Sequence, residues 1–347
     1  MAYTTIDDPS AYFQTTLYAG DGNGSGQAIT HGGNSDLQAD FIWIKNRTDA
    51  ENHSLTDSVR GANKGVLSNS SDAESTDNSN GYLSSFNSDG FTTANAGVYN
   101  NASSKNYVSW NWKAGGSSST NTDGSQNTTV SVNTTAGFSI VKWTGADSTG
   151  SLGHGLGAVP KMIIAKRLAT RNWTVYHVAM GANKKLFLNT NAAETSIADF
   201  DATPTSSVIN VGYTDDANGS GSDYIGYVFA EKQGYSKFGS YTGNGNADGP
   251  MIWTGFKPAF IMYKNTARAI SWLIHDNKRL GYNPDNDEQH PDTNATDGTD
   301  DRADILSNGF KIRESSNLMN VSGEQVIYMA FAENPFVTSS GVPATAR

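Results

Sequence analysis

The residues best suited to acid–base chemistry are Asp57 and Asp276, which occupy equivalent positions in two copies of a repeated segment. Two carboxyl groups roughly 5–10 Å apart can cleave a glycosidic bond, one acting as the acid and the other as base or nucleophile. The second copy has His177 at this position, however, and each Asp stands three residues before an arginine, Arg60 or Arg279. The pattern favours a structural carboxylate that caps a turn or pairs with its arginine, so we assign no catalytic residue.

Histidines offer little for a metal site or a nucleophile. The six histidines form no HxH or HxxxH pair, and the chain has no cysteine. A zinc or Cys/His site would need such groups to converge. His154 lies in the glycine-rich stretch 153–157, but Pro160 and a predicted strand follow where a phosphate loop needs Lys-Ser/Thr and a helix. We therefore expect no cofactor, and read His177 and His275 as half-buried strand residues.

Two acidic, Asn-rich stretches, 21–26 and 292–301, carry oxygen ligands of the kind that calcium prefers. Neither has the glutamate that completes an EF-hand loop at its twelfth position. Solvated turns are the favoured interpretation, and calcium binding stays open.

Tryptophans could provide sugar-stacking platforms. Five of them, however, lie at or near predicted strands, where the repeat requires core residues: Trp43, Trp143, Trp173, Trp253 and Trp272. Large aromatic side chains contribute most when they are buried, so we expect most of these to pack in cores. An exposed aromatic on a loop tip remains a candidate for glycan binding.

A pattern of about one hundred residues positions all of these groups, and it occurs three times. A single offset of 219 carries nine residues of the first copy onto identical residues of the third: Phe41, Lys45, Asp57, Arg60, Ser88, Gly90, Phe91, Asn101 and Ser103. The middle copy fits with an offset of 120, by which the residues 61–64 recur at 181–184. Such a repeat indicates a modular scaffold, and its length suits a small β-sandwich.

Each copy contains the same succession of predicted strands. Near-continuous apolar runs at 41–45, 162–166 and 260–264 are typical of strands covered on both faces. Second strands follow at 53–57, 173–177 and 272–276, then a strand at 185–189, and tight turns at 88–91 and 307–310. Closing strands lie at 107–112, 224–229 and 326–331, with Val108, Trp110 and Trp112 on one face. We predict an all-β protein of three tandem antiparallel β-sandwich modules.

The expected organisation has six parts. An N-terminal arm (1–16) either anchors the protein to a partner or packs on the first module, which spans 17–114. A flexible Gly/Ser/Thr/Asn-rich linker (115–136) leaves this module free to be set apart. The second module (137–234) runs almost directly into the third (235–336), so these two should lie against each other, and a C-terminal tail (337–347) completes the chain.

Composition narrows the classes of partner. Charged residues are 17% of the 347, and the formal net charge is −10 with a pI near 5.0. This balance disfavours nucleic-acid binding, which needs clustered Lys and Arg, and gives no attraction to anionic membranes. No secretory signal and no apolar stretch of the roughly 18 residues that span a membrane are visible. The 7 Trp, 15 Tyr and 14 Phe can fill cores, so disorder is not expected.

Several motifs resemble a family of repeat-containing virion structural proteins of tailed, chiefly marine, bacteriophages. The similarity is carried by residues 41–47, 57–61, 67–69, 87–91 and 110–114, and in the third copy by 235–245 and 331–336. It covers nearly the whole chain. The resemblance implies lectin-like, laminin-G-type jelly-roll modules and a place in the virion, and it brings no catalytic residues.

We therefore expect a non-enzymatic virion protein, assembled in the host cytoplasm and displayed as a fibre or appendage of the tail or head. Its expected partners are other virion proteins, bound through the N-terminal arm, and further copies of itself. A host-surface glycan-binding module and a capsid decoration protein are the alternatives, and a polysaccharide depolymerase comes last. Neither nucleic acid nor membrane is an expected partner.

Overall fold

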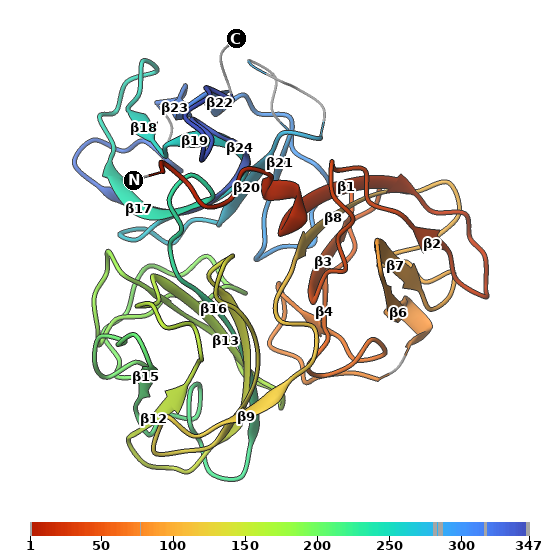
Figure 1. Cartoon of the computed structure of the whole chain (residues 1–347), viewed down its shortest axis with the longest axis vertical. Helices are drawn as coiled ribbons and strands as arrows, with labels where there is room; N and C mark the ends of the chain where they lie inside the picture. Colours follow the sequence, from red (N-terminus) through yellow and green to blue (C-terminus); the bar gives the residue numbers. More distant parts are fainter. Residues whose placement is uncertain (1, 77, 280–282, 284–286, 316–317, 345–347) are drawn as a thin grey trace.

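The computed structural model describes residues 2–76, 78–279, 283, 287–315 and 318–344. Within these residues the fold is all-β, with six antiparallel sheets, no α-helix and two 3-10 turns, η1 (Pro9–Ala11) and η2 (Asn78–Asn80). Figure 1 shows three lobes arranged around a common centre. Met1 and residues 345–347, at the ends of the expected arm and tail, lie outside the described residues. The all-β class is confirmed, and six sheets are consistent with several β-sandwich units.

Each lobe contains one large and one small sheet, and we call the lobes units 1, 2 and 3. Unit 1 has the large sheet β1-β8-β3-β4-β5 and the small sheet β2-β7-β6. Its strands are β1 (Phe13–Ala19), β2 (Ala28–Ile29), β3 (Phe41–Asn46), β4 (Ser54–Asp57), β5 (Val66–Leu67), β6 (Leu83–Asn87), β7 (Gly90–Thr93) and β8 (Asn106–Trp112).

Units 2 and 3 repeat this plan with different edges. Unit 2 has the large sheet β14-β13-β16-β11-β10-β9 and the small sheet β12-β15, and unit 3 has β17-β24-β19-β20-β21 and β18-β23-β22. The strands of unit 2 are β9 (Ser119–Asn121), β10 (Thr128–Asn133), β11 (Phe138–Thr144), β12 (Gly150–Gly153), β13 (Met162–Arg167), β14 (Trp173–His177), β15 (Val208–Val211) and β16 (Asp223–Phe229). Those of unit 3 are β17 (Ser236–Thr242), β18 (Met251–Trp253), β19 (Phe256–Asn265), β20 (Leu273–Asp276), β21 (Glu288–Gln289), β22 (Ala303–Leu306), β23 (Gly309–Ile312) and β24 (Gln325–Pro335).

Strand β3 shows why the apolar runs are continuous. Successive side chains of a strand point to opposite faces of its sheet. Ile42 and Ile44 face the small sheet of unit 1, whereas Phe41 and Trp43 face the centre of the molecule. The equivalent strands β13 and β19 divide in the same way. The prediction of strands covered on both faces is confirmed, as is the shared face of Val108, Trp110 and Trp112.

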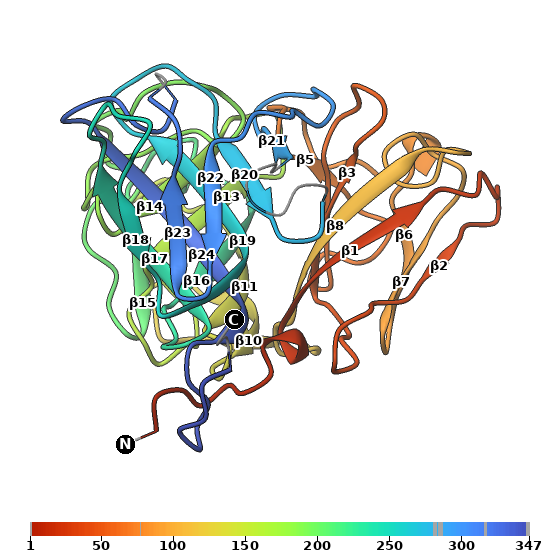
Figure 2. The same cartoon turned by 90° about the horizontal axis from the view of Figure 1, so that it is seen from above.

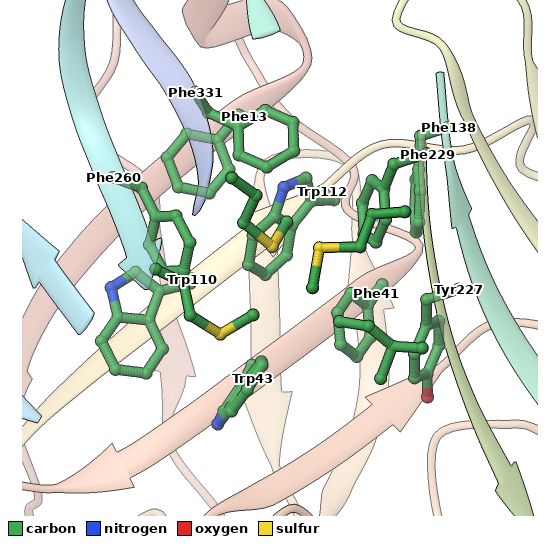
Figure 3. Packing of buried hydrophobic residues seen from close by; sticks show 14 of the residues in the cluster. Phe13, Phe41, Trp43, Trp110, Trp112, Phe138, Tyr227, Phe229, Phe260 and Phe331 are labelled. Carbon is green, nitrogen blue, oxygen red and sulfur yellow. The ribbon is translucent and has the colours of Figure 1, made fainter. Parts of the chain in front are cut away.

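One hydrophobic core is common to all three units, and it lies where the large sheets meet. Figure 3 shows aromatic side chains converging there from all three units. Phe41 of unit 1 stacks on Tyr227 of unit 2 with ring centroids 3.9 Å apart, and Trp112 meets Phe331 of unit 3 at 5.7 Å. The expectation that unit 1 is set apart is therefore wrong: its outward-facing aromatics are covered by the other two units rather than by solvent.

The segment 115–136, expected to be a flexible linker, is folded. β10 pairs with β11 from Thr129↔Lys142 to Asn133↔Phe138, and β9 extends the sheet further. The apolar side chain of Val130 reaches the core of unit 2 and is buried. Composition suggested flexibility, but β-branched Thr and Val at alternating positions suit a strand once a neighbouring edge is available.

The predicted strand at 185–189 is also corrected. The structure has only isolated bridges there, Val175↔Leu186 and Lys185↔Thr195. This segment packs against unit 3, as described below.

The N-terminal arm contacts both unit 3 and unit 1. Its residues 3–6 pack chiefly on unit 3, whereas Asp8 accepts from the Ser35 hydroxyl of unit 1 (2.6 Å) and residues 13–16 form part of β1. Tyr3 donates its hydroxyl to the carbonyl of Gly255 (2.7 Å), Thr4 donates to the carbonyl of Gln233 (2.9 Å), and Ile6 enters the shared core. Figure 2 shows this segment running beneath unit 3 before it enters β1. The Asp7 carboxylate also accepts from the amide of Ser339 (2.6 Å), so the arm contacts the C-terminal tail as well.

Candidate functional site

The units are joined in a ring, because each sends a loop onto the next. At the junction of units 1 and 2, the indole Nε1 of Trp173 donates to the carbonyl of Leu67 (2.9 Å). At the junction of units 2 and 3, the indole Nε1 of Trp272 donates to the carbonyl of Phe187 (2.8 Å). The two tryptophans are fully buried and occupy equivalent positions in the repeat, Trp173 at the start of β14 and Trp272 directly before β20. A buried indole N–H needs an acceptor, so each indole fixes the loop of the preceding unit.

At the third junction a histidine replaces the tryptophan. His53 Nε2 lies 3.1 Å from the carbonyl of His290 in unit 3, and Trp43 donates its indole N–H to His53 Nδ1 (2.9 Å). Burial and then the nearby Lys45 charge lower the pKa of His53 well below its usual value. A neutral imidazole that accepts at Nδ1 donates at Nε2. His53 thus supplies the same N–H that the indoles supply elsewhere.

A backbone hydrogen bond repeats at each junction and completes the threefold pattern. The amide of Glu74 donates to the carbonyl of Leu168 (2.8 Å), and that of Glu194 donates to the carbonyl of Thr266 (2.8 Å). The equivalent bond from Asp297 of unit 3 to the carbonyl of Arg47 in unit 1 is 3.4 Å long. The carboxylate of Asp297 also pairs with the Arg47 guanidinium. Unit 3 therefore returns to unit 1 without a covalent connection, and the ring is closed.

Asp57 lies at the junction of units 1 and 2. One of its carboxylate oxygens accepts from the backbone amides of Val59 (3.1 Å) and Arg60 (2.9 Å), and the other pairs with Arg60 Nε (2.5 Å). That second oxygen also accepts from the hydroxyl of Tyr227 in unit 2 (2.9 Å). Burial and then the Asp57 charge raise the pKa of Tyr227 well above its usual value. Both structural roles expected for this Asp, capping a turn and pairing with Arg60, are present.

Asp276 makes the same arrangement at the junction of units 3 and 1. It pairs with Arg279 Nε (2.7 Å) and accepts from the indole Nε1 of Trp110 in unit 1 (3.0 Å). Burial alone would raise the pKa of Asp276, but the Arg279 charge and the N–H donors outweigh it and lower the pKa. Its carboxylate is therefore held ionised and fully occupied, which leaves no lone pair aimed at solvent.

The junction of units 2 and 3 has no such ion pair. His177 stands where the other units have Asp, and Met180 stands where they have Arg. His177 Nδ1 accepts from the Ala179 amide (3.2 Å) and Nε2 lies 3.2 Å from the carbonyl of Tyr328 in unit 3. Burial lowers the pKa of His177 to about 4. Both His177 and His275, expected to be half-buried, are fully buried.

The acidic stretches are not alike. In 21–26, Asp21 accepts from the Asn23 amide (2.8 Å) and from the buried side chain of Asn101 (3.0 Å). This turn is held by hydrogen bonds within the stretch and to Asn101 of the same unit. Stretch 292–301, expected to be a solvated turn, instead carries the ring-closing contacts of Asp297 and an Asp292 carboxylate that accepts from the Trp272 amide (3.1 Å). Sequence gave no sign that this loop is an interface.

Most of the tryptophans pack in cores, as expected. Trp43, Trp143, Trp173 and Trp272 are buried. Trp253 is the exception: it is 51% exposed on β18 and lies 5.3 Å from the Phe336 ring, edge to face. It remains the aromatic side chain most available to a ligand among these five.

A cleft of about 560 Å³ lies at the junction of units 3 and 1. One wall is strand β1 from Phe13 to Leu17, and the opposite wall contains Ala259, Asn277 and the segment 332–334. Figure 1 shows β1 on the side of unit 1 that faces unit 3. The lining is chiefly polar and holds one lysine, Lys278, and one glutamate, Glu333. Glu333 pairs with Lys257 at 2.7 Å, so it brings no free charge to the cleft.

Polar atoms of this cleft lack partners within the described residues. Thr15 Oγ1 and Asn277 Oδ1 are buried and make no hydrogen bond. Thr15 is only 8% exposed, and it stands where units 2 and 3 have the core residues Ile140 and Phe238. Such atoms are costly to leave unpaired. Sequence reasoning missed these residues, although a polar Thr in place of Ile and Phe was a signal available in the repeat.

The described residues contain no group of three or more His, Cys, Asp or Glu side chains placed to hold a metal ion. No helix in the described part of the chain is long and apolar enough to cross a membrane.

The family model described as a domain of unknown function (DUF7483) matches residues 8–335. The chain therefore belongs to this family, and the match spans all three units. Comparison with curated proteins and with solved structures gives no match.

Proposed function

We propose that this DUF7483 protein is a non-enzymatic structural protein of a bacteriophage virion, displayed on the particle surface as a fibre or appendage of the tail or head. The motifs at 41–47, 57–61 and 87–91 resemble those of such virion proteins. The observation that carries the proposal is the closed ring. Asp57 and Asp276, the residues best suited to catalysis, are tied to arginines and to donors of a neighbouring unit. An interlocked ring of this kind suits a protein that must stay rigid outside the cell.

Purified particles of the phage that encodes this chain provide the test. Mass spectrometry of gradient-purified particles should find the chain as a stoichiometric component, and gold-labelled antibodies should decorate the particle surface. Particles that contain none of the chain would refute the assignment. Labelling of the head rather than the tail would favour the capsid decoration alternative.

The finer fold proposed for each unit is a lectin-like β-sandwich of the laminin-G or jelly-roll type. The opposition of a large and a small sheet around a separate core supports it in unit 1, where Ile42 of β3 packs with Phe91 of β7. Comparison of an experimental structure of the chain with jelly-roll domains, strand by strand, is the test. A different strand connectivity would replace this assignment.

Attachment to other virion proteins through the N-terminal arm remains a proposal, with a narrower surface than expected. Tyr3, Thr4 and Ile6 are engaged by unit 3, so only outward side chains such as Thr5 are free to meet a partner. Deleting the whole arm would also remove part of the core. Thr5→Arg is the cleaner variant: it should reduce incorporation into particles while thermal stability stays unchanged, and normal incorporation would refute this role.

Binding of a host-surface glycan is the second candidate, and the exposed indole of Trp253 favours it. An exposed aromatic face beside polar groups is suited to sugar stacking. The test is a glycan array with the wild-type protein and with Trp253→Ala. Hits that vanish in the variant would support this role, and an array without hits would remove it.

A further inference from the structure

The outer edge of β1 is bare, whereas the equivalent edge in unit 2 is covered. β1 and β11 occupy the same place, since each pairs with the closing strand of its own unit. In unit 2, however, the sheet continues beyond β11 to β10 and β9, while in unit 1 it stops at β1. A bare edge presents unpaired N–H and C=O groups, which is the usual template for adding a strand.

The backbone groups on the bare edge can be identified from the pairing on the other edge. The amide of Lys113 donates to the carbonyl of Tyr12, and the amide of Gly20 donates to the carbonyl of Lys105. In an antiparallel pair such residues alternate with those whose backbone groups point away. Even-numbered residues of β1 therefore bond to β8, and the N–H and C=O groups of Thr15 and Leu17 point outward into the cleft.

The space that is open in this cleft is filled by polypeptide at the equivalent position of the junction of units 1 and 2. There the Asp40 carboxylate accepts from the amides of Ala114 (2.8 Å) and Gly116 (3.2 Å), and Gly115 donates to the Ser131 hydroxyl of β10 (3.0 Å). A polypeptide segment thus fills the space between unit 1 and the β11 edge. Ala259 is the residue of unit 3 that corresponds to Asp40, and it lines the open cleft.

We propose that this cleft binds an extended polypeptide segment of a partner protein, which adds to β1 as an antiparallel strand in the way that β10 adds to β11. The unpartnered Thr15 Oγ1 and Asn277 Oδ1 would then gain hydrogen-bond partners. Strand addition takes its affinity from main-chain hydrogen bonds and its specificity from alternate side chains. A saccharide fits less well, because Phe13, the aromatic residue of the lining, is buried and offers no stacking face.

The covered edge of unit 2 indicates what the partner segment looks like. Val130 lies opposite Val141 and is buried in the unit 2 core, whereas Ser131 lies opposite Ile140 on the other face. Transferred to β1, these positions lie opposite Thr16 and Thr15. The segment should therefore carry a β-branched residue opposite Thr16 and a small polar residue opposite Thr15. This inference stands whether or not the chain is a virion protein.

The probe is a fluorescein-labelled peptide with the sequence of residues 126–135 of this chain, titrated into the whole protein and followed by fluorescence polarisation. We expect saturable binding with Kd below about 1 mM, an affinity of about 4 kcal/mol or more. Hydrogen exchange should show new protection of the Thr15 and Leu17 amides. A peptide with proline in place of the serine equivalent to Ser131 should not bind, because it lacks the ladder N–H, whereas alanine there should be tolerated.

A matched pair of protein variants tests the edge itself. Leu17 is 39% exposed, so Leu17→Ala and Leu17→Pro both spare the core. Leu17→Pro removes an outward N–H and should weaken binding about tenfold or more, while Leu17→Ala should stay within about threefold. Unchanged thermal unfolding establishes that both variants are folded.

Three results would overturn the proposal. They are no saturable binding of the wild-type protein, equal binding by Leu17→Pro and Leu17→Ala, or protection confined to amides away from β1. The cleft would be assigned to sugars instead by a neutral oligosaccharide that binds the wild-type protein and both variants equally. Its binding would have to shift the nuclear magnetic resonance signals of the residues that line the cleft.

Discussion

Two junctions of the ring differ in the residues that fill the same buried positions. They are the junction of units 1 and 2 and the junction of units 2 and 3. In the first, Asp57 and Arg60 form a fully buried ion pair that accepts a hydrogen bond from Tyr227. In the second, His177 and Met180 fill the same positions without a charge. Both sites are buried, so burial alone does not decide which solution is used.

The difference follows from what the next unit presents. Trp110 and Tyr227 occupy equivalent positions in β8 and β16, and each brings a donor to a buried carboxylate. The equivalent residue of β24 is Met329, which has no donor. A carboxylate there would be left without part of its hydrogen bonding, and an unsatisfied buried charge is costly. A neutral histidine that donates to a carbonyl avoids that cost, so each junction is matched to its neighbour across the ring.

Removing one member of a buried ion pair should have the largest effect. Arg279→Met leaves Asp276 buried with only its N–H donors, and we expect the free energy of unfolding to fall by about 3–5 kcal/mol. Urea denaturation followed by tryptophan fluorescence measures it.

The double variant Asp276→His with Arg279→Met transplants the unit 2 pair and removes the stranded charge. It should be more stable than Arg279→Met alone. A double variant that loses the sum of the two single losses would show that the pair is not coupled, against the account given for these junctions.

The junction of units 2 and 3, which has His177 in place of an ion pair, should instead lose stability at acidic pH. The pKa of His177 is lowered to about 4 by burial, whereas in the unfolded chain it is near 6.5. The unfolded state therefore takes up the proton first, so the stability that neutral His177 permits is complete above about pH 6.5 and is lost as the pH falls toward 4. At pH 4 the free energy of unfolding should therefore be about 3 kcal/mol lower than at neutral pH because of this histidine. His177→Asn should make the stability profile less steep across this window, where His31 and His275, whose pKa values burial also lowers to about 4, keep part of the slope. An unchanged slope would contradict the buried, neutral histidine.

The indole donors are expected to matter less than the ion pairs. Trp272→Phe keeps most of the ring but leaves the carbonyl of Phe187 without its N–H donor. We expect a loss of about 1–3 kcal/mol in the free energy of unfolding. Trp143→Phe, whose indole bonds to Ala217 within its own unit, is the control for ring size, because it leaves every junction intact. A loss in Trp272→Phe that is accompanied by no increase in hydrogen exchange at 186–194 would argue against the docking role.

The smallest effect should come from the exposed ion pair of unit 2. Lys184 and Glu194 lie 2.7 Å apart, but the lysine side chain is 41% exposed. Exposed pairs contribute about 0–1 kcal/mol, so Lys184→Ala should change the free energy of unfolding by less than about 1 kcal/mol. A larger loss would mean that this pair stabilises the unit 2 junction in place of the missing Arg.

The sequence was informative about strands and uninformative about their partners. Residues 41–45 predict a strand covered on both faces, because Phe, Ile, Trp and Ile follow one another before Lys45. Nothing in that run shows that Phe41 meets Tyr227 of another unit, since this contact joins residues far apart in the chain. Arg60 was expected to pair with Asp57, a local contact, but the Tyr227 donor was not foreseen.

The linker and the acidic loop show the same limit. Small polar residues at 115–136 indicated flexibility, yet β10 gains its order from the edge of β11. Loop 292–301 resembled a solvated turn, yet Asp297 closes the ring on Arg47. In both cases the stabilising partner is supplied by tertiary structure, which propensity does not contain.

Because the three repeated units share one core, we expect them to unfold together. Differential scanning calorimetry of the whole chain measures this cooperativity. At about 0.7 kcal/mol per residue, cooperative unfolding should give a single transition whose van't Hoff and calorimetric enthalpies are both about 240 kcal/mol. Separate transitions, or a van't Hoff enthalpy near one third of the calorimetric value, would show that the units melt independently and would contradict the shared core.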